Sequence, residues 1–394
     1  MKSDFRLLDA SEKISSEQIR PGLTYWKDAW RRLKKNKLAM IGLVVIGLMT
    51  LFAIFGPLFT PYEYSDQKVG FTNLPPRIEI IKTGDKYFYF NGDYYFLFTS
   101  TKDGRLLEKL DEVSTDTINK RVTYDLAGES VVIDFSYKLT PRPGFEDVKY
   151  SVTYDGVEYT ETYKTLTNKL FPWGSDDLGR DVLTRVMYGA RISLFIALVA
   201  ALVNLIIGVL YGSIAGLEGG LVDDIMMRIL DVIDSIPLLL YVILIMVILD
   251  DNSMFTVILT LGLVYWVGMA RLVRGQVLGL KNQEFVLAAR SLGVSKYKIV
   301  FKHLIPNALG PIIVSITMMI PAAIFTEAFL SYIGLGASAP QASWGTLAND
   351  GAKVYRTSFY QLVYPALAIA ITILAFNFFG DGLRSALDPK LRKG

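Results

Sequence analysis

Residues 284–307 read EFVLAARSLGVSKYKIVFKHLIPN, and the rest of the chain is best understood from this stretch. It lies between two long apolar segments. The pattern predicts a helix with Ala288, Ala289 and Leu292 on one side, a break at Gly293 and a restart before Pro306. Basic side chains run from the end of the first apolar segment almost to the start of the second: Arg271, Arg274, Lys281, Arg290, Lys296, Lys298 and Lys302. Such a helix in a short membrane loop makes sense if another protein must grip the loop.

The apolar residues of the chain are clumped into long runs. They make up 52% of its 394 residues, and a run of about 18 or more mostly apolar residues is typical of a membrane-spanning helix. We therefore expect an all-α polytopic membrane protein with six spans, at residues 38–59, 193–214, 236–249, 255–273, 309–332 and 362–379. The third run is short, and a polar helical stretch before it is expected to supply part of its length.

Basic residues orient the expected spans. They precede the first run (Arg31, Arg32, Lys34, Lys35 and Lys37), and they recur between spans four and five and at the end of the chain. Because Lys and Arg favour the cytoplasmic side, both termini are expected in the cytoplasm. An acidic stretch at 218–234 lies on the same side, but acidic residues weigh little in topology. The first run has no small-residue cleavage site after it, so we interpret it as a retained helix.

The residues between the first two spans have a different character. Short runs rich in Tyr, Phe, Val, Ile and Thr recur at 78–82, 86–90, 94–98, 131–138, 148–154 and 157–163. Asn91-Gly92-Asp93 and Asp155-Gly156 separate two pairs of these runs and are hairpin signals. A small antiparallel β domain outside the cell is predicted. The expected organisation is a cytoplasmic arm 1–37, a first helix 38–60, an extracytoplasmic β-rich insert 61–175, a transmembrane core 176–383 whose cytoplasmic loop helix is 284–301, and a cytoplasmic tail 384–394.

Several chemistries are not expected. The chain has no cysteine, and His303 is its only histidine, so no disulfide, thiolate site or zinc site is expected and His303 is given a structural role. The net charge of +3 and the absence of a basic–aromatic module do not favour nucleic acid. No phosphate-binding loop, H-E-x-x-H or G-x-S-x-G occurs, so the chain is not expected to be an enzyme or to hydrolyse ATP.

The spacing Glu-x3-Ala-Ala-x3-Gly, then x9-His-Leu-x-Pro-Asn, resembles the EAA coupling motif of ABC importer permeases. Three other regions resemble dipeptide and oligopeptide permeases: GSDDLGRDVLTR at 174–185, LSYIGLG and SWG within 330–345, and AFN, GDGLR and LDP within 375–389. The basic arm and first run resemble the N-terminal region of the C-type subunit. The resemblance covers about residues 25–60 and 172–391, and the β insert looks far longer than the usual loop of this family.

This resemblance implies a type I importer permease in a bacterial or archaeal cell membrane. It implies four kinds of partner: a second homologous permease subunit, two cytoplasmic ATPases, an extracytoplasmic substrate-binding protein and membrane lipid. ATP and Mg would be held by the ATPases, with no cofactor or metal on this chain. Peptides are the implied cargo, with nickel chelates or oligosaccharides as the alternative. A passive channel or β-domain display protein is a rival of another class, which would bring no ATPase on purification.

The resemblance also implies ATPase-coupling roles for Glu284, Ala288, Ala289, Gly293, His303, Pro306 and Asn307. The alternative for this segment is a basic amphipathic loop lying on anionic lipid. The tyrosines of the insert either fill a small β core or contact peptide or a binding protein.

Polar residues within or beside the spans are candidates for a translocation pathway or gate. Glu327 lies inside span five and faces either such a pathway or a neighbouring helix. Asn204 and Asn377 are expected to form hydrogen bonds between helices. Asp231 and Asp234, with Asp223, Asp224 and Arg228, form either a solvated helix face with local ion pairs or part of an inner gate.

The predicted topology can be tested by cysteine labelling, because the chain has no cysteine of its own. Cysteine at Asp93 or Asp155 should react with a membrane-impermeant reagent in intact cells, since both hairpins are expected outside. Cysteine at Ser295 should react only after the membrane is opened. Labelling of Ser295 alone in intact cells would reverse the assignment.

Overall fold

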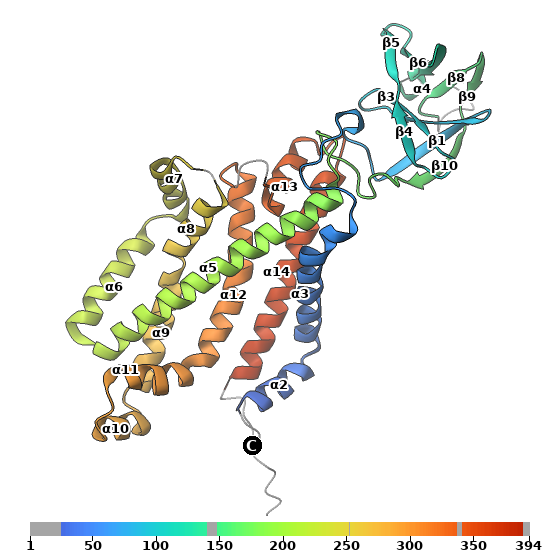
Figure 1. Ribbon diagram of the computed structural model, residues 1–394. Coiled ribbons are helices and arrows are strands. Elements are labelled where there is room, and N and C mark those ends of the chain that lie inside the picture. Colours follow the sequence, from blue (N-terminus) through green and yellow to red (C-terminus); the bar gives the residue numbers. More distant parts are fainter. Residues whose placement is uncertain (1–24, 140–147, 252, 337–340, 389–394) are drawn as a thin grey trace, which may run out of the picture.

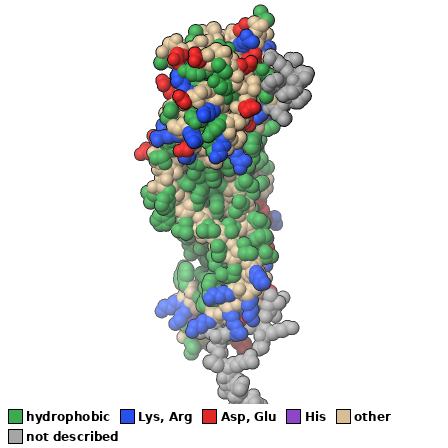
Figure 2. All heavy atoms as spheres, turned by 90° about the vertical axis from the view of Figure 1, so that its right-hand side faces the viewer, with side chains coloured by type: hydrophobic (Ala, Val, Ile, Leu, Met, Phe, Trp, Pro, Cys, Tyr) green, Lys and Arg blue, Asp and Glu red, His purple; other side chains and the backbone are tan. Residues whose placement is uncertain are grey.

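The computed structural model describes residues 25–139, 148–251, 253–336 and 341–388. Long helices lie side by side, and all the strands gather beyond one end of the bundle (Figure 1). We call this the sheet end, and the opposite end the basic end. Figure 2 shows why: an apolar surface covers the middle, mixed charges cover the strands, and Lys and Arg collect at the far end. Such an apolar belt between two charged ends is the surface that a bilayer requires.

The helices follow the apolar runs of the sequence. They are α2 (Tyr25–Lys35), α3 (Lys37–Phe55), α5 (Val182–Glu218), α6 (Gly220–Ser235), α7 (Leu238–Leu249), α8 (Met254–Val264), α9 (Trp266–Leu280), α12 (Ile305–Tyr332), α13 (Trp344–Lys353) and α14 (Tyr360–Leu387). Within the described ranges, five continuous helical stretches are long and apolar enough to cross a membrane: Lys37–Phe59, Val182–Glu218, Met254–Leu280, Lys296–Tyr332 and Tyr360–Leu387. A sixth crossing exists only if α6 and α7 count as one span.

The predicted third span at 236–249 contains a helix, α7, that is too short to cross a membrane alone. Its 12-residue helix α7 is about 18 Å long, which is short of the roughly 30 Å of a bilayer core. The polar helix α6 before it does not continue its axis, because the two are bent by 84° at Ile236 and Pro237. Pro237 lacks a backbone N–H and disfavours a helical Ile236, so the helix must end there.

Two helices extend beyond the predicted bounds of their spans. Helix α5 begins at Val182 and not at 193, because Asp181 caps it by accepting from the backbone N–H of Thr184 at 2.8 Å. At the other end of the chain, α14 continues to Leu387. The tail predicted to start at 384 is therefore helical through its first residues.

Helices α5 and α9 pack closely because of glycines spaced four residues apart. A Cβ at Gly208 would lie 2.6 Å from Met269 Cβ, and one at Gly212 would lie 2.3 Å from the carbonyl oxygen of Ala270. Gly216 meets α9 one turn further on, 2.9 Å from the carbonyl oxygen of Arg274. In lipid, where burial of apolar surface gives no gain, small residues allow the close contact that holds helices together.

The strands form two antiparallel five-stranded sheets with simple neighbour connections, in the orders β10-β1-β2-β3-β4 and β5-β6-β7-β8-β9. The bounds are β1 Arg77–Thr83, β2 Lys86–Asn91, β3 Phe96–Ser100, β4 Leu106–Lys109, β5 Asp111–Asp116, β6 Arg121–Leu126, β7 Glu129–Asp134, β8 Ser151–Tyr154, β9 Val157–Tyr159 and β10 Thr162–Thr167. We call this unit the sheet domain. The turn at Asp155 and Gly156 has positive φ at both residues, as a two-residue hairpin requires.

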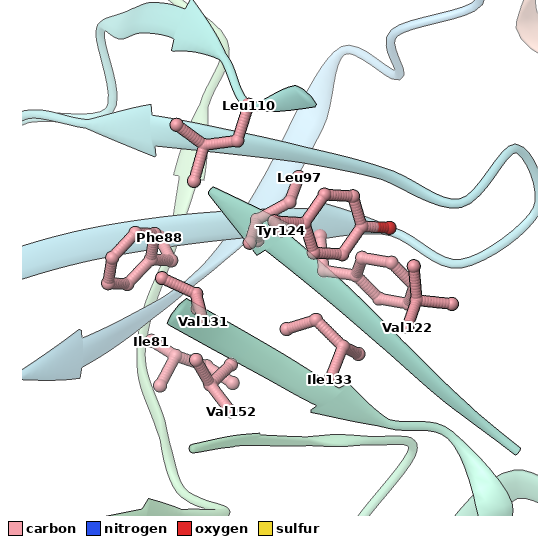
Figure 3. Close-up of a cluster of buried hydrophobic side chains, with 10 residues drawn as sticks. Ile81, Phe88, Leu97, Leu110, Val122, Tyr124, Val131, Ile133 and Val152 are labelled. Carbon is pink, nitrogen blue, oxygen red and sulfur yellow. The ribbon is translucent and has the colours of Figure 1, made fainter. Parts of the chain in front are cut away.

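The sheet domain has a core between its sheets (Figure 3). Ile81, Phe88 and Leu97 of the first sheet meet residues of the second, which include Val122, Tyr124, Val131, Ile133 and Val152. The alternate residues of the first sheet, such as Tyr89 and Phe98, pack on a second cluster with Leu74 and Phe171. The first sheet is therefore buried on both faces, and its other face covers the chain that leads to α5.

The predicted strands differ from the structure where polar or turn residues intervene. The run 94–98 starts as a strand only at Phe96, because Tyr95 has φ +55°. The run 131–138 ends at Asp134, and a short helix α4 (Ser136–Leu139) follows. The run 157–163 is split into β9 and β10, and the run 148–154 is a strand only from Ser151. Strands β4, β5 and β6 were not predicted. β5 is exposed along its whole length, while β4 and β6 bury only Leu106, Val122 and Tyr124 among polar and charged neighbours.

The two-sheet core predicts that residues 66–170 fold alone into a β-rich unit. In that fragment Ile133→Ala should lower the free energy of unfolding by about 2–5 kcal/mol, because Ile133 is fully buried. The matched change Val113→Ala, at an exposed position of β5, should alter it by less than about 0.5 kcal/mol. Circular dichroism during urea unfolding measures both, and a random-coil spectrum for the parent fragment would contradict the prediction.

Candidate functional site

The segment at 284–307 forms a short helix with a defined end. Helix α10 (Glu284–Ser291) starts at Gln283 and has the acidic Glu284 in its first turn, where negative charge suits the helix dipole. It ends in a Schellman motif: the N–H of Val294 donates to Ala289 O at 3.1 Å and that of Gly293 to Arg290 O at 2.9 Å. Gly293 has φ +74°, so the break predicted there is confirmed.

The two faces of α10 differ. Val286 and Ala289 are buried against Val273 and Val277 of α9 and Ala308 of α12. The expectation that Ala288 and Ala289 share a face with Leu292 is therefore wrong for Ala289, which points into the protein. The opposite face is open, and Leu292 is 83% exposed.

Exposed apolar residues continue this open face beyond α10. Phe285 and Ala288 lie with Leu292 on α10, while Tyr297 (78% exposed) and Phe301 follow on the next turns. We call these five residues the apolar face. It lies at the basic end of the molecule, at the tip of the bundle (Figure 1). Exposed apolar side chains gathered beside basic ones are typical of a site where another protein docks.

The chain then returns to the bundle through a wider turn. Helix α11 (Lys296–Ile299) leads into a π-helical segment, Val300–Leu304, and α12 follows with Pro306 in its first turn. The helical structure therefore resumes at Lys296, ten residues before Pro306. Asn307 donates from Nδ2 to the carbonyl oxygen of His303 at 2.6 Å, which stabilises the π-to-α junction. The half-buried His303 contributes its backbone here.

Ion pairs and backbone contacts fix the segment to the end of α5. Lys296 Nζ lies 2.7 Å from Glu218 Oε2. Lys281 Nζ donates to the carbonyl oxygen of Gly216 at 2.9 Å, where α5 leaves its last carbonyls unpaired. The apolar face is thus carried on a support that touches α5, α9 and α12.

Two arginines of α9 pair with the acidic helix α6. Arg271 lies 3.0 Å from Asp231 Oδ1 and 2.6 Å from Asp234 Oδ2. Arg274 makes a forked contact with the buried Asp223, at 2.6 Å and 3.1 Å. The acidic residues of α6 therefore pair with arginines of α9, and the expected ion pairs with Arg228 within α6 are not the ones that form. The sequence contained a signal for the real pairing, because Arg271 and Arg274 share a face of one helix as Asp231 and Asp234 share a face of the other.

Glu327 is 1% exposed and lies inside the bundle. Its carboxylate accepts from Ser193 Oγ of α5 at 3.0 Å and from Ser331 Oγ at 2.7 Å. Ser193 Oγ also accepts from the backbone N–H of Trp344, the first residue of α13, at 3.2 Å. Glu327 therefore joins α12 to α5 and to the start of α13.

The two asparagines do not form the expected contacts. Asn204 is buried, but neither its amide nitrogen nor its oxygen has a hydrogen-bond partner. Asn377 is half-buried on α14, and its side chain makes no hydrogen bond within the described residues. The expectation of an interhelical hydrogen bond is thus wrong for Asn204.

A buried ion cluster lies where the chain leaves the sheet domain and enters α5. Asp176 Oδ2 lies 2.7 Å from Arg180 Nε and 2.5 Å from Arg185 Nη1, and its Oδ1 accepts from the backbone N–H of Arg180 at 2.8 Å. All three side chains are almost fully buried. A buried carboxylate with this many donors satisfies two arginines that would otherwise be costly to bury.

Backbone contacts extend this junction, which we call the clamp (residues 174–185 with 68–74, Tyr360 and Gln361). The N–H of Asn73 donates to Asp176 O at 2.8 Å, and Tyr360 Oη donates to Ser175 O at 2.8 Å. A Cβ at Gly179, which has φ +71°, would lie 1.9 Å from Lys68 O, so only glycine fits. The sequence marked this stretch only as a family signature. Only the fold shows that Asp176, Arg180 and Arg185 are buried together and form ion pairs.

The described residues contain no group of three or more His, Cys, Asp or Glu side chains that could hold a metal ion. The arrangement consists of a docking face, ion pairs between helices and a rigid joint. Its chemistry is that of protein contact and helix movement.

Comparisons with known proteins agree on one family. Residues 208–393 match the family described as "Binding-protein-dependent transport system inner membrane component", and residues 24–76 match "N-terminal TM domain of oligopeptide transport permease C". The chain is 40% identical over 383 residues to an oligopeptide transport system permease protein of Bacillus subtilis, covering 97% of this chain and 94% of that protein. A dipeptide transport system permease protein of the same organism is 39% identical, covering 95% and 88%.

A more distant relative also matches over nearly its full length. The oligopeptide transport system permease protein of Escherichia coli is 34% identical over 391 residues, which cover 99% of this chain and 98% of that protein. These matches extend over nearly the whole chain, from the helices before the sheet domain to the helices after it.

Loss of the central charge of the clamp should destabilise the whole molecule. Asp176→Asn leaves Arg180 and Arg185 buried without a counter-charge, which should cost about 3–5 kcal/mol. Asp177→Asn is the matched control, because Asp177 is 64% exposed and lies 3.8 Å from Arg180, and it should cost less than about 0.5 kcal/mol. Thermal unfolding of the purified full-length variants measures both, and equal midpoints would show that the cluster is not a joint.

Proposed function

This chain belongs to the family of binding-protein-dependent transport system inner membrane components, and from that premise we propose that it is the transmembrane subunit of an ATP-driven importer of oligopeptides or dipeptides. Its full-length relatives are oligopeptide and dipeptide permease proteins. In this role it forms half of a type I importer pore with a second, homologous permease subunit. Two cytoplasmic ATPases bind and hydrolyse ATP with Mg, and an extracytoplasmic binding protein delivers the peptide.

The observation that carries the proposal is the apolar face on α10. Leu292 and Tyr297 are almost fully exposed at the tip of the bundle, while Val286 and Ala289 fix the same helix to α9 and α12. Large apolar side chains that are exposed to water at one place indicate a surface that a partner covers. A groove on each ATPase is the partner that this helix fits, in the helix-in-groove mode.

The support under the apolar face explains how movement passes to the pore. When the ATPases close, α10 moves with its docking groove, and the packed contacts of Val286 and Ala289 carry α9 and α12 with it. The other residues have local roles in this segment. Glu284 starts α10, Ala288 lies on its exposed face and Gly293 ends it. Pro306 and Asn307 lie where α12 begins. His303 contributes through its backbone carbonyl. ATP binding then favours one of two packings of the helices.

The orientation follows from the charges of the two ends. The basic end, with α2 and α10, lies in the cytoplasm, and the sheet domain lies outside the cell. The binding protein therefore approaches from the sheet end. The domain boundaries of this arrangement are a cytoplasmic arm through residue 37, an extracytoplasmic insert at 61–175 and a short cytoplasmic tail after α14.

The polar residues of the bundle then divide by location. Asp231 and Asp234 form ion pairs with Arg271 that connect α6 to α9, and these ion pairs must break if the two helices separate at an inner gate. Glu327 holds α5, α12 and α13 together near the outer mouth. Asn377 is half-buried on α14 and faces the translocation pathway in one of the two states.

The coupling role of Gly293 can be separated from mere assembly. Gly293→Val should abolish most peptide uptake, because a β-branched residue is strained at φ +74° and would reshape the end of α10. Gly293→Asn should retain most uptake, since asparagine tolerates this conformation. No atom outside the adjacent residues lies within 4 Å of an added Cβ, so neither change disturbs the core.

The measurements are uptake of a labelled peptide into proteoliposomes and co-purification of the ATPases. Normal uptake and normal ATPase association for Gly293→Val would rule out the coupling role of this segment. Recovery of the protein without any ATPase from wild-type membranes would instead favour a passive channel.

A further inference from the structure

A cavity of about 350 Å³ opens where the sheet domain meets the helix bundle. Its walls come from the chain before β1, from β1 itself, from the β2–β3 loop and from Thr357 just before α14. This volume falls within the roughly 300–1,000 Å³ of typical small-molecule sites. The apolar face and the α6–α9 ion pairs lie toward the other end of the molecule, so the cavity serves neither.

Six of the fifteen residues that line this cavity are aromatic: Tyr89, Phe90, Tyr94, Tyr95, Phe135 and Tyr150. They support one another, with ring centroids 5.0 Å apart for Phe90 and Tyr150 and 5.0 Å apart for Tyr95 and Phe135. Burial raises the pKa of the Tyr89 and Tyr150 phenols, so both remain neutral at physiological pH. Such walls accept an apolar or aromatic side chain while they offer hydroxyl groups for hydrogen bonds.

Arg77 provides a free cation at the same cavity. It is exposed on β1, and within the described residues its guanidinium has no ion pair or hydrogen bond. The other cation that lines the cavity, Lys149, is paired with Glu79 at 2.8 Å. The planar guanidinium fork matches a carboxylate, so the ligand that fits best carries one.

The cavity is held in shape by contacts to the bundle. Asn91 donates from Nδ2 to Asn73 O at 3.2 Å, and Gln361 of α14 donates to Asn73 Oδ1 at 2.8 Å. The hydroxyls of Tyr94 and Thr357 lie 3.0 Å apart. The β2–β3 loop is therefore fixed before any ligand arrives, which lowers the entropic cost of binding.

We propose that this cavity binds the C-terminal end of a short peptide, with its last side chain against the tyrosines and its carboxylate on Arg77. The site rests on the proposed function, because it assigns the sheet domain a place for the same cargo. A concave site of this size suits a chain end. Docking of a folded partner would need a surface of roughly 800 Å² on each side.

The test uses the assembled transporter, purified with its partner subunits in lipid nanodiscs and without the binding protein. The probes are radiolabelled Ala-Ala-Phe with a free carboxylate and the same tripeptide as its C-terminal amide, and equilibrium dialysis measures their binding. Arg77→Glu should weaken binding of the free acid about 10- to 100-fold, as expected for loss of a charged hydrogen bond. The amide should bind wild type as weakly as the acid binds this variant.

Two further variants locate the site. Lys82→Glu changes another exposed cation of β1 that does not line the cavity, and it should leave binding unchanged. Gly92→Phe should fill the cavity and abolish binding of both probes, while Gly92→Ala should not. An added Cβ at Gly92 meets Phe90 at 3.7 Å, an ordinary contact, so the loop tolerates the change.

Uptake of the same tripeptide with the binding protein present is measured in parallel. Uptake by wild type without any binding in the nanodisc assay, or equal binding by wild type, Arg77→Glu and Gly92→Phe, overturns the site and leaves the importer function intact. Failure to take up any peptide overturns the proposed function instead. If Arg77→Glu weakens capture of the binding protein but not of the tripeptide, the cavity is a protein-docking socket and the proposal is wrong.

Discussion

The junction around Asp176 is the contact on which the two halves of this molecule depend. A sheet domain that needs water and a helix bundle that needs lipid are joined by two chain segments, one entering and one leaving the domain. Without a rigid contact these segments would act as a hinge. Asp176 binds Arg180 and Arg185 in a buried cluster, while its backbone carbonyl accepts from Asn73 on the entering segment. The sheet domain therefore has a fixed position over the ends of α5 and α14.

A continuous set of packed contacts leads from this joint to the opposite end. Helix α5 starts at the clamp and runs along the bundle to Glu218, about 55 Å away. Its glycines bring it against α9, whose Val273 and Val277 pack on Val286 and Ala289 of α10. The apolar face and the sheet domain are thus connected through one rigid helix and one close helix pair. Close-packed contacts of this kind move between discrete arrangements and do not deform gradually.

The charged groups of the bundle differ in their access to water. The pairs of Arg271 and Arg274 with α6 are partly exposed and can exchange their partners for water. Glu327 has hydroxyl partners on two elements and no such access. Asn204 is buried without a partner, which is costly in any one packing. Ser213 of α5 and Thr372 of α14 likewise have buried hydroxyls without a hydrogen-bond partner among the described residues.

The sequence alone determined the kind of protein, because its signals are local. Apolar runs fix where helices cross lipid, Asn91-Gly92-Asp93 and Asp155-Gly156 fix hairpins, and a glycine at 293 ends a helix through its own backbone freedom. The spaced residues of 284–307 likewise placed the chain in its family. Tertiary structure decided what depends on distant partners: the 84° bend that breaks the expected third span, the inward face of Ala289, and the pairing of α6 with arginines of α9. It also decided the clamp and the aromatic cavity, whose residues come from segments more than a hundred positions apart. Residue type says which contacts a side chain can make, but only the packed fold supplies the partner and removes the water.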